Sequence, residues 1–185
     1  MVCMTDHDMA TARSANGAGR VRGQRGMSGL MQTVAVAGAV GAVLVGGVFF
    51  AFSAFVMPAL RRLPAAHGIG AMQSINRTAV TAPLMLALFG TAVLSGIAIV
   101  WAIRSWGHVS APWLLAGGLA YLAAVVITVA ANVPLNDSLA GLDPASAGAP
   151  AQWAGFVTRW TAWNHLRGAG AVAGGLAFIL ALTRL

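Results

Sequence analysis

The chain has 185 residues, of which 58% are hydrophobic and only 8% are charged. Soluble domains carry roughly a quarter charged residues, so this composition excludes an ordinary soluble enzyme and indicates an integral membrane protein. A net charge of +7 would suggest a nucleic-acid partner in a soluble protein. Here the arginines lie in the flanks and loops of apolar runs, where lipid headgroups and membrane topology account for them, so no nucleic-acid partner is expected.

The first 27 residues contain four arginines among Gly, Ser, Thr and Ala, without apolar periodicity. This composition predicts a disordered, Arg-rich tail over 1–27, followed by a single transmembrane domain over 28–185. Arginines ahead of an apolar run are also typical of a secretory signal. The run at 31–57 is longer than the ~7–15 apolar residues of a signal, so we expect a first helix that is retained.

Four apolar runs are each long enough to cross a bilayer, which requires about 20 residues. They cover approximately 31–57, 79–103, 112–135 and 163–183. The short links between them favour an up-down-up-down bundle. The fourth run contains Gly170 and Gly174, a pair of small residues that permits close backbone contact without proving dimerisation, so a homo-oligomer is left open.

The link between the first two runs contains a short amphipathic segment. Its apolar side carries Ile69, Met72 and Ile75, and its polar side carries Gln73, Asn76 and Arg77. This pattern is typical of a helix that lies at the membrane interface. The predicted fold is therefore all-α: an integral membrane four-helix bundle with a short interfacial helix between spans 1 and 2.

The arginine distribution bears on orientation. Four spans place both termini on one side of the membrane, with six arginines on that side and five on the other. This difference is small for the positive-inside rule, but the dense cluster ahead of the first span favours a cytoplasmic tail. We expect a multi-pass protein of the cell membrane with both termini in the cytoplasm.

Residues 152–167, with the sequence Q-W-A-G-F-V-T-R-W-T-A-W-N-H-L-R, carry three of the six tryptophans and lead into the fourth run. At 3.6 residues per turn, one helical stripe contains Trp153, Phe156, Trp160, Asn164 and Arg167. Thr161 and His165 form a second pair beside that stripe. Polar groups and flat aromatic rings are thus predicted to gather at the mouth of a membrane helix.

In a four-span bundle, the ends of spans 1 and 3 and the starts of spans 2 and 4 share one membrane face. The polar and aromatic residues expected to converge there are Arg61, Arg62, Asn76, Arg77, Asn132, Asn136, Asp137, Trp160, Trp163, Asn164, His165 and Arg167. An unpaired amide in hydrocarbon costs roughly 2–7 kcal/mol. Asn132 is therefore expected to face Asn164, Arg167 or a polar cavity.

Two interpretations of this cluster remain open. In the structural one, Asn136 and Asp137 cap or turn the helix end, Asp137 pairs with an arginine, and the tryptophans form an interfacial belt. In the functional one, buried intramembrane polar groups mark a site. Arg167 fits both, since it either extends to lipid headgroups or binds an anion.

The cluster also bears on metals and cofactors. A metal site needs three or four converging ligands, and this cluster offers one histidine and two loop aspartates, so no metal is expected. Cys3 is the single cysteine, which excludes internal disulfides and cysteine metal clusters. Because no histidine lies at mid-membrane depth for haem and no glycine-rich nucleotide motif follows a strand, no cofactor is expected.

Four motifs carry a resemblance to a known family: N-V-P-L-N-D at 132–137, R-W-T-A-W-N-H-L-R at 159–167, F-S-A-F-V-M-P-A-L-R-R-L-P at 52–64 and A-M-Q-S-I-N-R at 71–77. Together they resemble the anthrone-oxygenase-like family of small four-span membrane proteins, over roughly residues 30–185. Fungal members are implicated in oxidising anthrones to anthraquinones. The resemblance implies an oxygenase that uses neither a metal nor a flavin.

The chemistry of the residues suggests roles for such a reaction. His165 would remove a substrate proton, while Asn164, Asn132 and Arg167 would stabilise the resulting oxyanion. The predicted catalytic residues are His165, Asn164 and Arg167. The predicted substrate-binding residues are Asn132, Asn136, Asp137, Trp160, Trp163, Asn76 and Arg77. The alternative hypothesis is a non-catalytic membrane module that binds a lipophilic ligand or a partner membrane protein.

Overall fold

The structure is a computed structural model that describes residues 6–80 and 82–185, with side chains described for 29–80 and 83–185. The elements are α1 Asp6–Ala51, η1 Phe52–Val56, α2 Met57–Arg61, α3 Ala65–Ala79, α4 Ala82–Arg104, α5 Ala111–Ile127, η2 Thr128–Asn132, α6 Val133–Ala140 and α7 Ala149–Leu182. Both η segments are single π-helical turns within longer helices. All elements over these ranges are helical, which confirms the all-α prediction.

Four segments of the described chain are long and apolar enough to cross a membrane. They are Gly29–Arg61, Pro83–Arg104, Ala111–Ala140 and Ala149–Leu182. The first runs through α1, η1 and α2, and the third through α5, η2 and α6. The four-span prediction is confirmed. The fourth helix begins at Ala149 rather than near 163, so 152–167 lies entirely within it.

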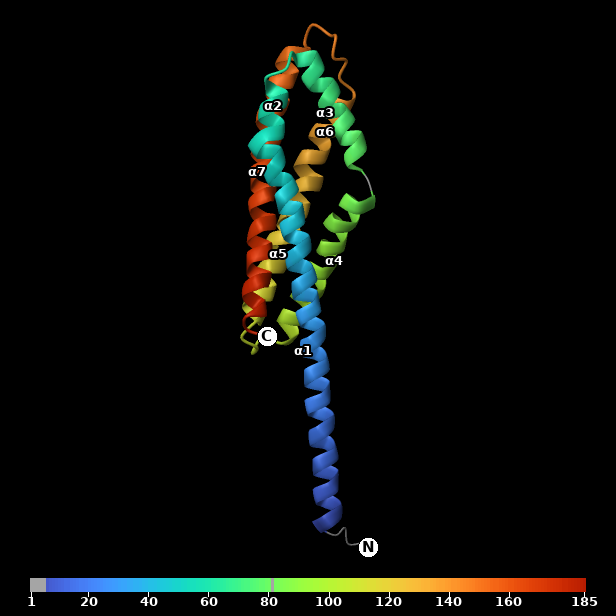
Figure 1. Cartoon of the computed structure of the whole chain (residues 1–185), viewed down its shortest axis with the longest axis vertical. Helices are drawn as coiled ribbons and strands as arrows, with labels where there is room; N and C mark the ends of the chain where they lie inside the picture. The colour runs from blue at the N-terminus through green and yellow to red at the C-terminus, as the bar shows by residue number, and fades with distance from the viewer. Residues whose placement is uncertain (1–5, 81) are drawn as a thin grey trace.

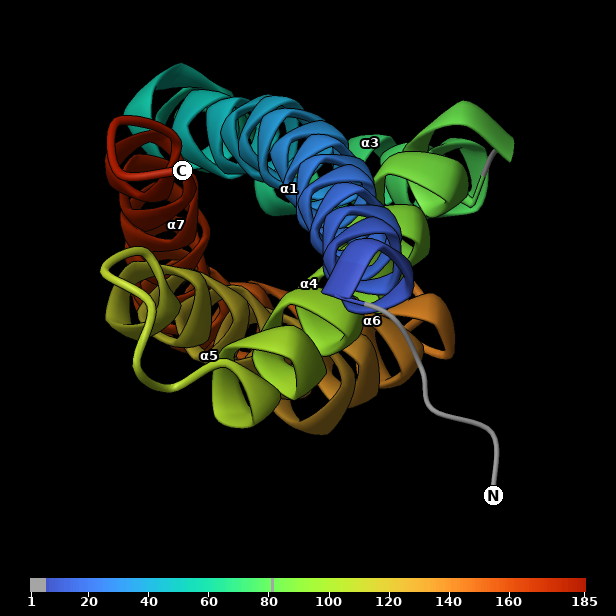
Figure 2. The same cartoon turned by 90° about the horizontal axis from the view of Figure 1, so that it is seen from below.

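The four long helices form a closed ring. Helix α1 packs against α4 and α7, and α5 packs against the same two helices, as the view from below shows (Figure 2). The start of the bundle in α1 and the C-terminus lie at the same end (Figure 1). Which side of the membrane holds that end stays a prediction. The disordered tail over 1–27 also stays a prediction. Residues 1–5 lie outside the described residues, α1 begins at Asp6, and no side chain before Gly29 is described.

The shortest span shows how much of the bundle a membrane covers. Pro83–Arg104 has 22 residues. At 1.5 Å per residue it measures about 33 Å, close to the ~30 Å of a hydrocarbon core. The other three spans have 30 to 34 residues, so their excess length extends beyond the hydrocarbon at the end where α4 begins. We call this extension, formed by α2, α3, α6 and the first turns of α7, the headpiece (Figure 1).

The headpiece has its own apolar core. The buried residues of this cluster are Met57, Leu60, Ile69, Met72, Leu139, Ala149, Trp153, Phe156, Val157 and Trp160. The predicted amphipathic helix is α3, and Ile69 and Met72 on its apolar side are completely buried in protein. Its Gln73 Nε2 donates hydrogen bonds of 2.9 Å to the carbonyl oxygens of Leu139 and Leu142. These bonds join α3 to the end of α6 and to the loop that follows it.

The two glycines of the fourth span pack within the chain. A Cβ atom added to Gly170 would lie 3.0 Å from the Ala120 carbonyl oxygen, and one added to Gly174 would lie 3.0 Å from that of Gly117. These distances are below an ordinary van der Waals contact, so α5 and α7 can approach this closely only because both positions lack a side chain. Whether the chain forms an oligomer stays a prediction.

Candidate functional site

The predicted stripe on α7 is continuous in the structure. Trp153, Phe156, Trp160, Asn164 and Arg167 are all buried. Trp153 and Phe156 stack at 5.6 Å between ring centroids, and Phe156 and Trp160 lie 6.3 Å apart. The aromatic part fills the headpiece core, while the two polar residues follow where the helix enters the membrane. The helical spacing therefore correctly predicted that these five residues share one face of the helix, and the structure shows that this face is buried.

Asn164 joins the fourth span to the first. Its Nδ2 donates hydrogen bonds of 2.7 Å to both the Phe49 carbonyl oxygen and Ser53 Oγ. Its Oδ1 accepts a 3.0 Å bond from Arg167 Nε. Ser53 belongs to the π-helical turn η1, and π turns within α-helices are frequent at functional sites. Both the Nδ2 and the Oδ1 atoms of Asn164 are therefore hydrogen-bonded, and the bond from Arg167 Nε fixes the position of the Arg167 side chain.

Arg167 is a buried cation whose partners are neutral. It is 7% exposed, and besides Asn164 its Nη1 donates a 3.4 Å bond to Thr128 Oγ1. The guanidinium carbon lies 4.0 Å from the ring centre of Phe49 and 5.1 Å from that of Trp160. Cation–π contact supplies part of the stabilisation that water would give. The acidic side chains of the described ranges, at 137 and 143, are exposed.

The two asparagines of the third span hold Trp160. Asn132 Nδ2 donates a 3.2 Å bond to the Trp160 carbonyl oxygen, and Trp160 Nε1 donates a 2.7 Å bond to Asn136 Oδ1. Asn132 ends the π-helical turn η2. Over the described residues, Asn132 Oδ1 and Asn76 Nδ2 are buried without a hydrogen-bond partner. The sequence predicts that Asn132 faces Asn164, Arg167 or a polar cavity, but its hydrogen-bond partner is the Trp160 carbonyl oxygen, one turn before Asn164 on the same helix.

A cavity of about 210 Å³ lies beside these groups. It is lined by Val45, Val48, Phe49, Phe52, Ile75, Asn76, Ala79, Val80, Leu84, Met85, Leu88, Phe89, Thr128, Val129, Val133, Asn136, Trp160 and Arg167. These walls come from α1, η1, α3, α4, η2, α6 and α7, at the level where α4 begins. The wall is mostly apolar, with Asn76, Asn136, Trp160 and Arg167 as its main polar groups. Such a pocket suits a flat, lipophilic molecule with one polar end.

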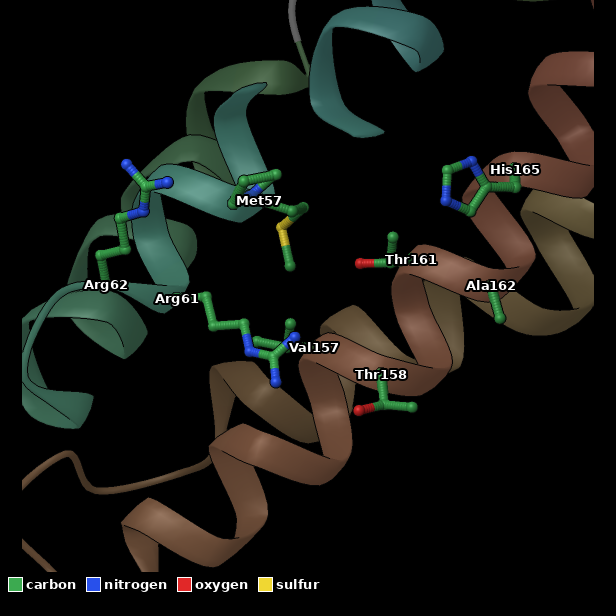
Figure 3. A pocket seen from close by; sticks show the side chains of 9 residues that line it. Met57, Arg61, Arg62, Val157, Thr158, Thr161, Ala162 and His165 are labelled. Atoms are coloured by element: carbon green, nitrogen blue, oxygen red, sulfur yellow. The ribbon is translucent and has the colours of Figure 1, made fainter. Parts of the chain in front are cut away.

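His165 faces a different hollow. Residues two apart on a helix point to nearly opposite sides, and His165 is exposed where Arg167 is buried. It lines a wider groove of about 650 Å³ between α2 and α7, together with Arg61, Arg62 and Thr161 (Figure 3). The structure therefore separates the predicted base from the predicted anion-binding arginine, and it keeps His165 and Thr161 together, as their spacing indicated.

A comparison with protein families matches residues 72–177 to the family described as anthrone oxygenase. The chain belongs to the anthrone oxygenase family. The matched range includes Asn76, the two asparagines of the third span, and Trp160 to Arg167. It thus confirms the resemblance that these motifs indicated. Comparisons with curated proteins and with solved structures gave no match.

In this family member, the predicted site residues divide into three groups. Asn76, Asn136, Trp160 and Arg167 line the cavity. Asn132 and Asn164 lie buried behind that wall. Arg77, Asp137, Trp163 and His165 are exposed. The roles assigned to all ten residues stay predictions, but the geometry brings only the first two groups together.

Two residues of the site escaped sequence reasoning. Phe49 and Thr128 both contact Arg167. They lie inside apolar runs, where a phenyl ring or a single hydroxyl is common and does not indicate a site. The phenylalanines at the end of the first run, at 49, 50, 52 and 55, are consistent with either packing or an interface and do not identify Arg167 as a partner. Within the described residues, no three or more His, Cys, Asp or Glu side chains come together as metal ligands would. The absence of a metal or cofactor stays a prediction.

Proposed function

We propose that the protein is a membrane oxygenase that binds a lipophilic hydroxyaromatic or polyketide-like substrate as its anion, with Arg167 holding the anionic oxygen. The observation that carries this proposal is the position of Arg167 on the cavity wall, buried and hydrogen-bonded only to neutral groups. A buried charge without a counter-ion is costly, so a bound anion would supply the missing partner. We place the protein in the cell membrane, with both termini in the cytoplasm.

The cavity walls suit a planar ring system. Phe49, Phe52 and Trp160 line it, and the Phe52 and Trp160 rings lie 5.6 Å apart at 50°. Aromatic faces stack on flat substrates, while the apolar walls exclude water and strengthen the interaction of the anion with the guanidinium. The buried Asn76 Nδ2, which lacks a partner among the described groups, offers a second donor to the substrate oxygen.

An anthrone-type substrate reacts with O₂ once it is ionised. The CH₂ group loses one proton, and the anion transfers one electron to O₂, which gives a substrate radical and superoxide. These recombine to form a C–O bond, and the hydroperoxide, once protonated, loses water to leave a carbonyl. Overall, CH₂ and O₂ give C=O and H₂O, a four-electron oxidation balanced by the four-electron reduction of O₂. The protein lowers the energy of the anion.

The lining of the cavity indicates which group accepts the proton that the substrate loses. Its described residues include no carboxylate and no imidazole. The cavity lies where α4 begins, and we assign this level to the boundary between the membrane core and the headgroups. The substrate therefore gives its proton to water at that level and is bound as the anion, which needs no protein base.

The test is oxygen consumption by the full-length protein in lipid nanodiscs with an anthrone, corrected for the protein-free rate. Arg167→Met should lower kcat/KM by about 10²-fold, the effect of removing one oxyanion-binding donor. Arg159→Met removes an exposed charge from the same helix and should leave the rate unchanged. A wild-type rate equal to the protein-free rate, or an unimpaired Arg167→Met variant, would contradict the proposal.

The second candidate is a non-catalytic module that binds the same kind of anion. It is favoured by the lack of a proton-transferring side chain among the described lining residues. Both candidates predict binding that depends on Arg167. They differ in turnover, because only the oxygenase consumes O₂ faster than the free substrate anion does.

A further inference from the structure

The groove between α2 and α7 lies apart from the cavity and has a different character. Its floor contains Met57 and Val157, which are 1% and 6% exposed, and its rim carries Arg61, Arg62 and His165. In Figure 3 the Arg61 side chain reaches toward α7 beside Val157, while the Thr161 hydroxyl and the His165 ring point toward the α2 side. The Arg61 guanidinium and the hydrogen-bonding groups of α7 thus line the same groove, above an apolar floor.

Thr161 is the least expected member of this groove. Threonine hydroxyls in helices commonly bond to the carbonyl four residues earlier. Thr158, on the same helix, does so with Ala154 at 3.0 Å. The Thr161 hydroxyl is buried and has no partner over the described residues. It is therefore available to donate a hydrogen bond to a molecule in the groove.

The depth of the groove matches a lipid headgroup and its glycerol ester region. Asn164 contacts Ser53, which places His165 at the level of η1, near the upper edge of the hydrocarbon. Arg61 lies eight residues beyond Ser53 along the first span, so about 12 Å further out. On the part of α7 that follows His165, Leu166 and Val172 are 54% and 43% exposed. These apolar side chains fit acyl chains.

We infer that this groove binds the phosphate of an anionic phospholipid. Arg61 and Arg62 contact the phosphate oxygens, Thr161 and His165 donate to phosphate or ester oxygens below, and the acyl chains follow the exposed apolar surface of α7. Basic pockets between membrane helices bind anionic headgroups in this way. The inference is independent of the proposed oxygenase activity, because it uses neither Arg167 nor the cavity.

The experiment compares lipid retention by the full-length protein, using native mass spectrometry after exchange into equal amounts of phosphatidylglycerol and phosphatidylcholine. The wild type should retain the anionic lipid about tenfold more than the zwitterionic one, given two arginines near the phosphate. Arg61→Gln with Arg62→Gln should bring the two lipids close to parity. Thr161→Val, which keeps size and charge, should reduce the retention of both lipids severalfold, because both carry the phosphate and ester oxygens to which Thr161 donates.

The matched control is Arg77→Gln with Arg159→Gln, which removes two exposed charges from the same membrane face outside the groove. It should retain the wild-type preference. An equal loss in this control would show a general surface-charge effect and overturn the inference. So would a wild type without preference, or displacement of the lipid by millimolar inorganic phosphate, which would identify a free anion as the occupant. Helical circular dichroism establishes that each variant is folded.

Discussion

Asn164 and Arg167 lie one helical turn apart on α7, and Asn164 Oδ1 accepts a 3.0 Å hydrogen bond from Arg167 Nε. The same amide donates to Phe49 and Ser53 of the first span. The residue that fixes the direction of the buried cation therefore also ties together two helices that are far apart in sequence. Site geometry and bundle stability share one side chain.

Replacing Asn164 by alanine should therefore impair both properties. The substitution leaves the Phe49 carbonyl and Arg167 Nε without this partner in a buried place, at roughly 1–3 kcal/mol for each unsatisfied group. Thermal unfolding in detergent should show a clearly lowered Tm, and anion binding should weaken. The exposed neighbour Trp163 gives the control Trp163→Phe, which should change neither. An unchanged Tm in Asn164→Ala would contradict the role of Asn164 in joining the first and fourth spans.

Phe49 tests the aromatic support of the cation. Its ring centre lies 4.0 Å from the guanidinium carbon. Phe49→Leu should weaken anion binding about fivefold, because the ring also lines the cavity, where stacking on a flat anion is worth about 1 kcal/mol. Phe50, the next residue in the sequence, is 67% exposed. Phe50→Leu should therefore leave the anion affinity unchanged in titrations monitored by tryptophan fluorescence. Equal losses in both variants would mean that the ring matters only for packing.

His165 distinguishes the predicted protein base from a substrate that ionises in water. Since His165 lines the groove and not the cavity, His165→Ala should reduce oxygen consumption by less than tenfold. A general base contributes about 10²–10⁴-fold, so a loss of that size would instead establish the catalytic role predicted from the sequence. His165→Gln, which keeps a hydrogen-bond donor, separates proton transfer from a contribution to packing.

The pH dependence of the rate should follow the substrate. If the anion forms before binding, the rate rises with pH through the pKa of the substrate in water, since the anionic fraction rises there. Two hydroxyaromatics of different acidity should give pH–rate profiles displaced by the difference between their pKa values. Profiles with the same midpoint for both substrates would instead report an ionising group of the protein.

Much of the fold was predictable because lipid makes strong demands on sequence. Each span needs about 20 apolar residues, and the four runs met this requirement. The stripe from Trp153 to Arg167 followed from helical spacing alone. Topology then placed Asn132 and Asn136 beside that stripe, since the ends of span 3 and the start of span 4 share a face.

Other features depend on tertiary packing and left little trace in the sequence. Residues 136–151 are rich in Asp, Pro, Ala and Gly, a composition typical of a loop, but α6 continues to Ala140 and α7 begins at Ala149. Hydropathy does not separate a tryptophan that faces lipid, such as Trp163, from one that faces protein, such as Trp160. The π-helical turns η1 and η2 insert one residue per turn and rotate the following face, without a sequence pattern that predicts them.

The most direct measurement of the central claim is the binding of a planar lipophilic phenolate and of its neutral methyl ether to the full-length protein in nanodiscs. The account predicts that the wild type binds the phenolate at least tenfold more tightly, because an opposite charge near a buried guanidinium is worth more than about 1.4 kcal/mol. Arg167→Met should abolish that preference, and Arg159→Met should retain it. Equal affinities of the wild type for the two ligands would contradict the account.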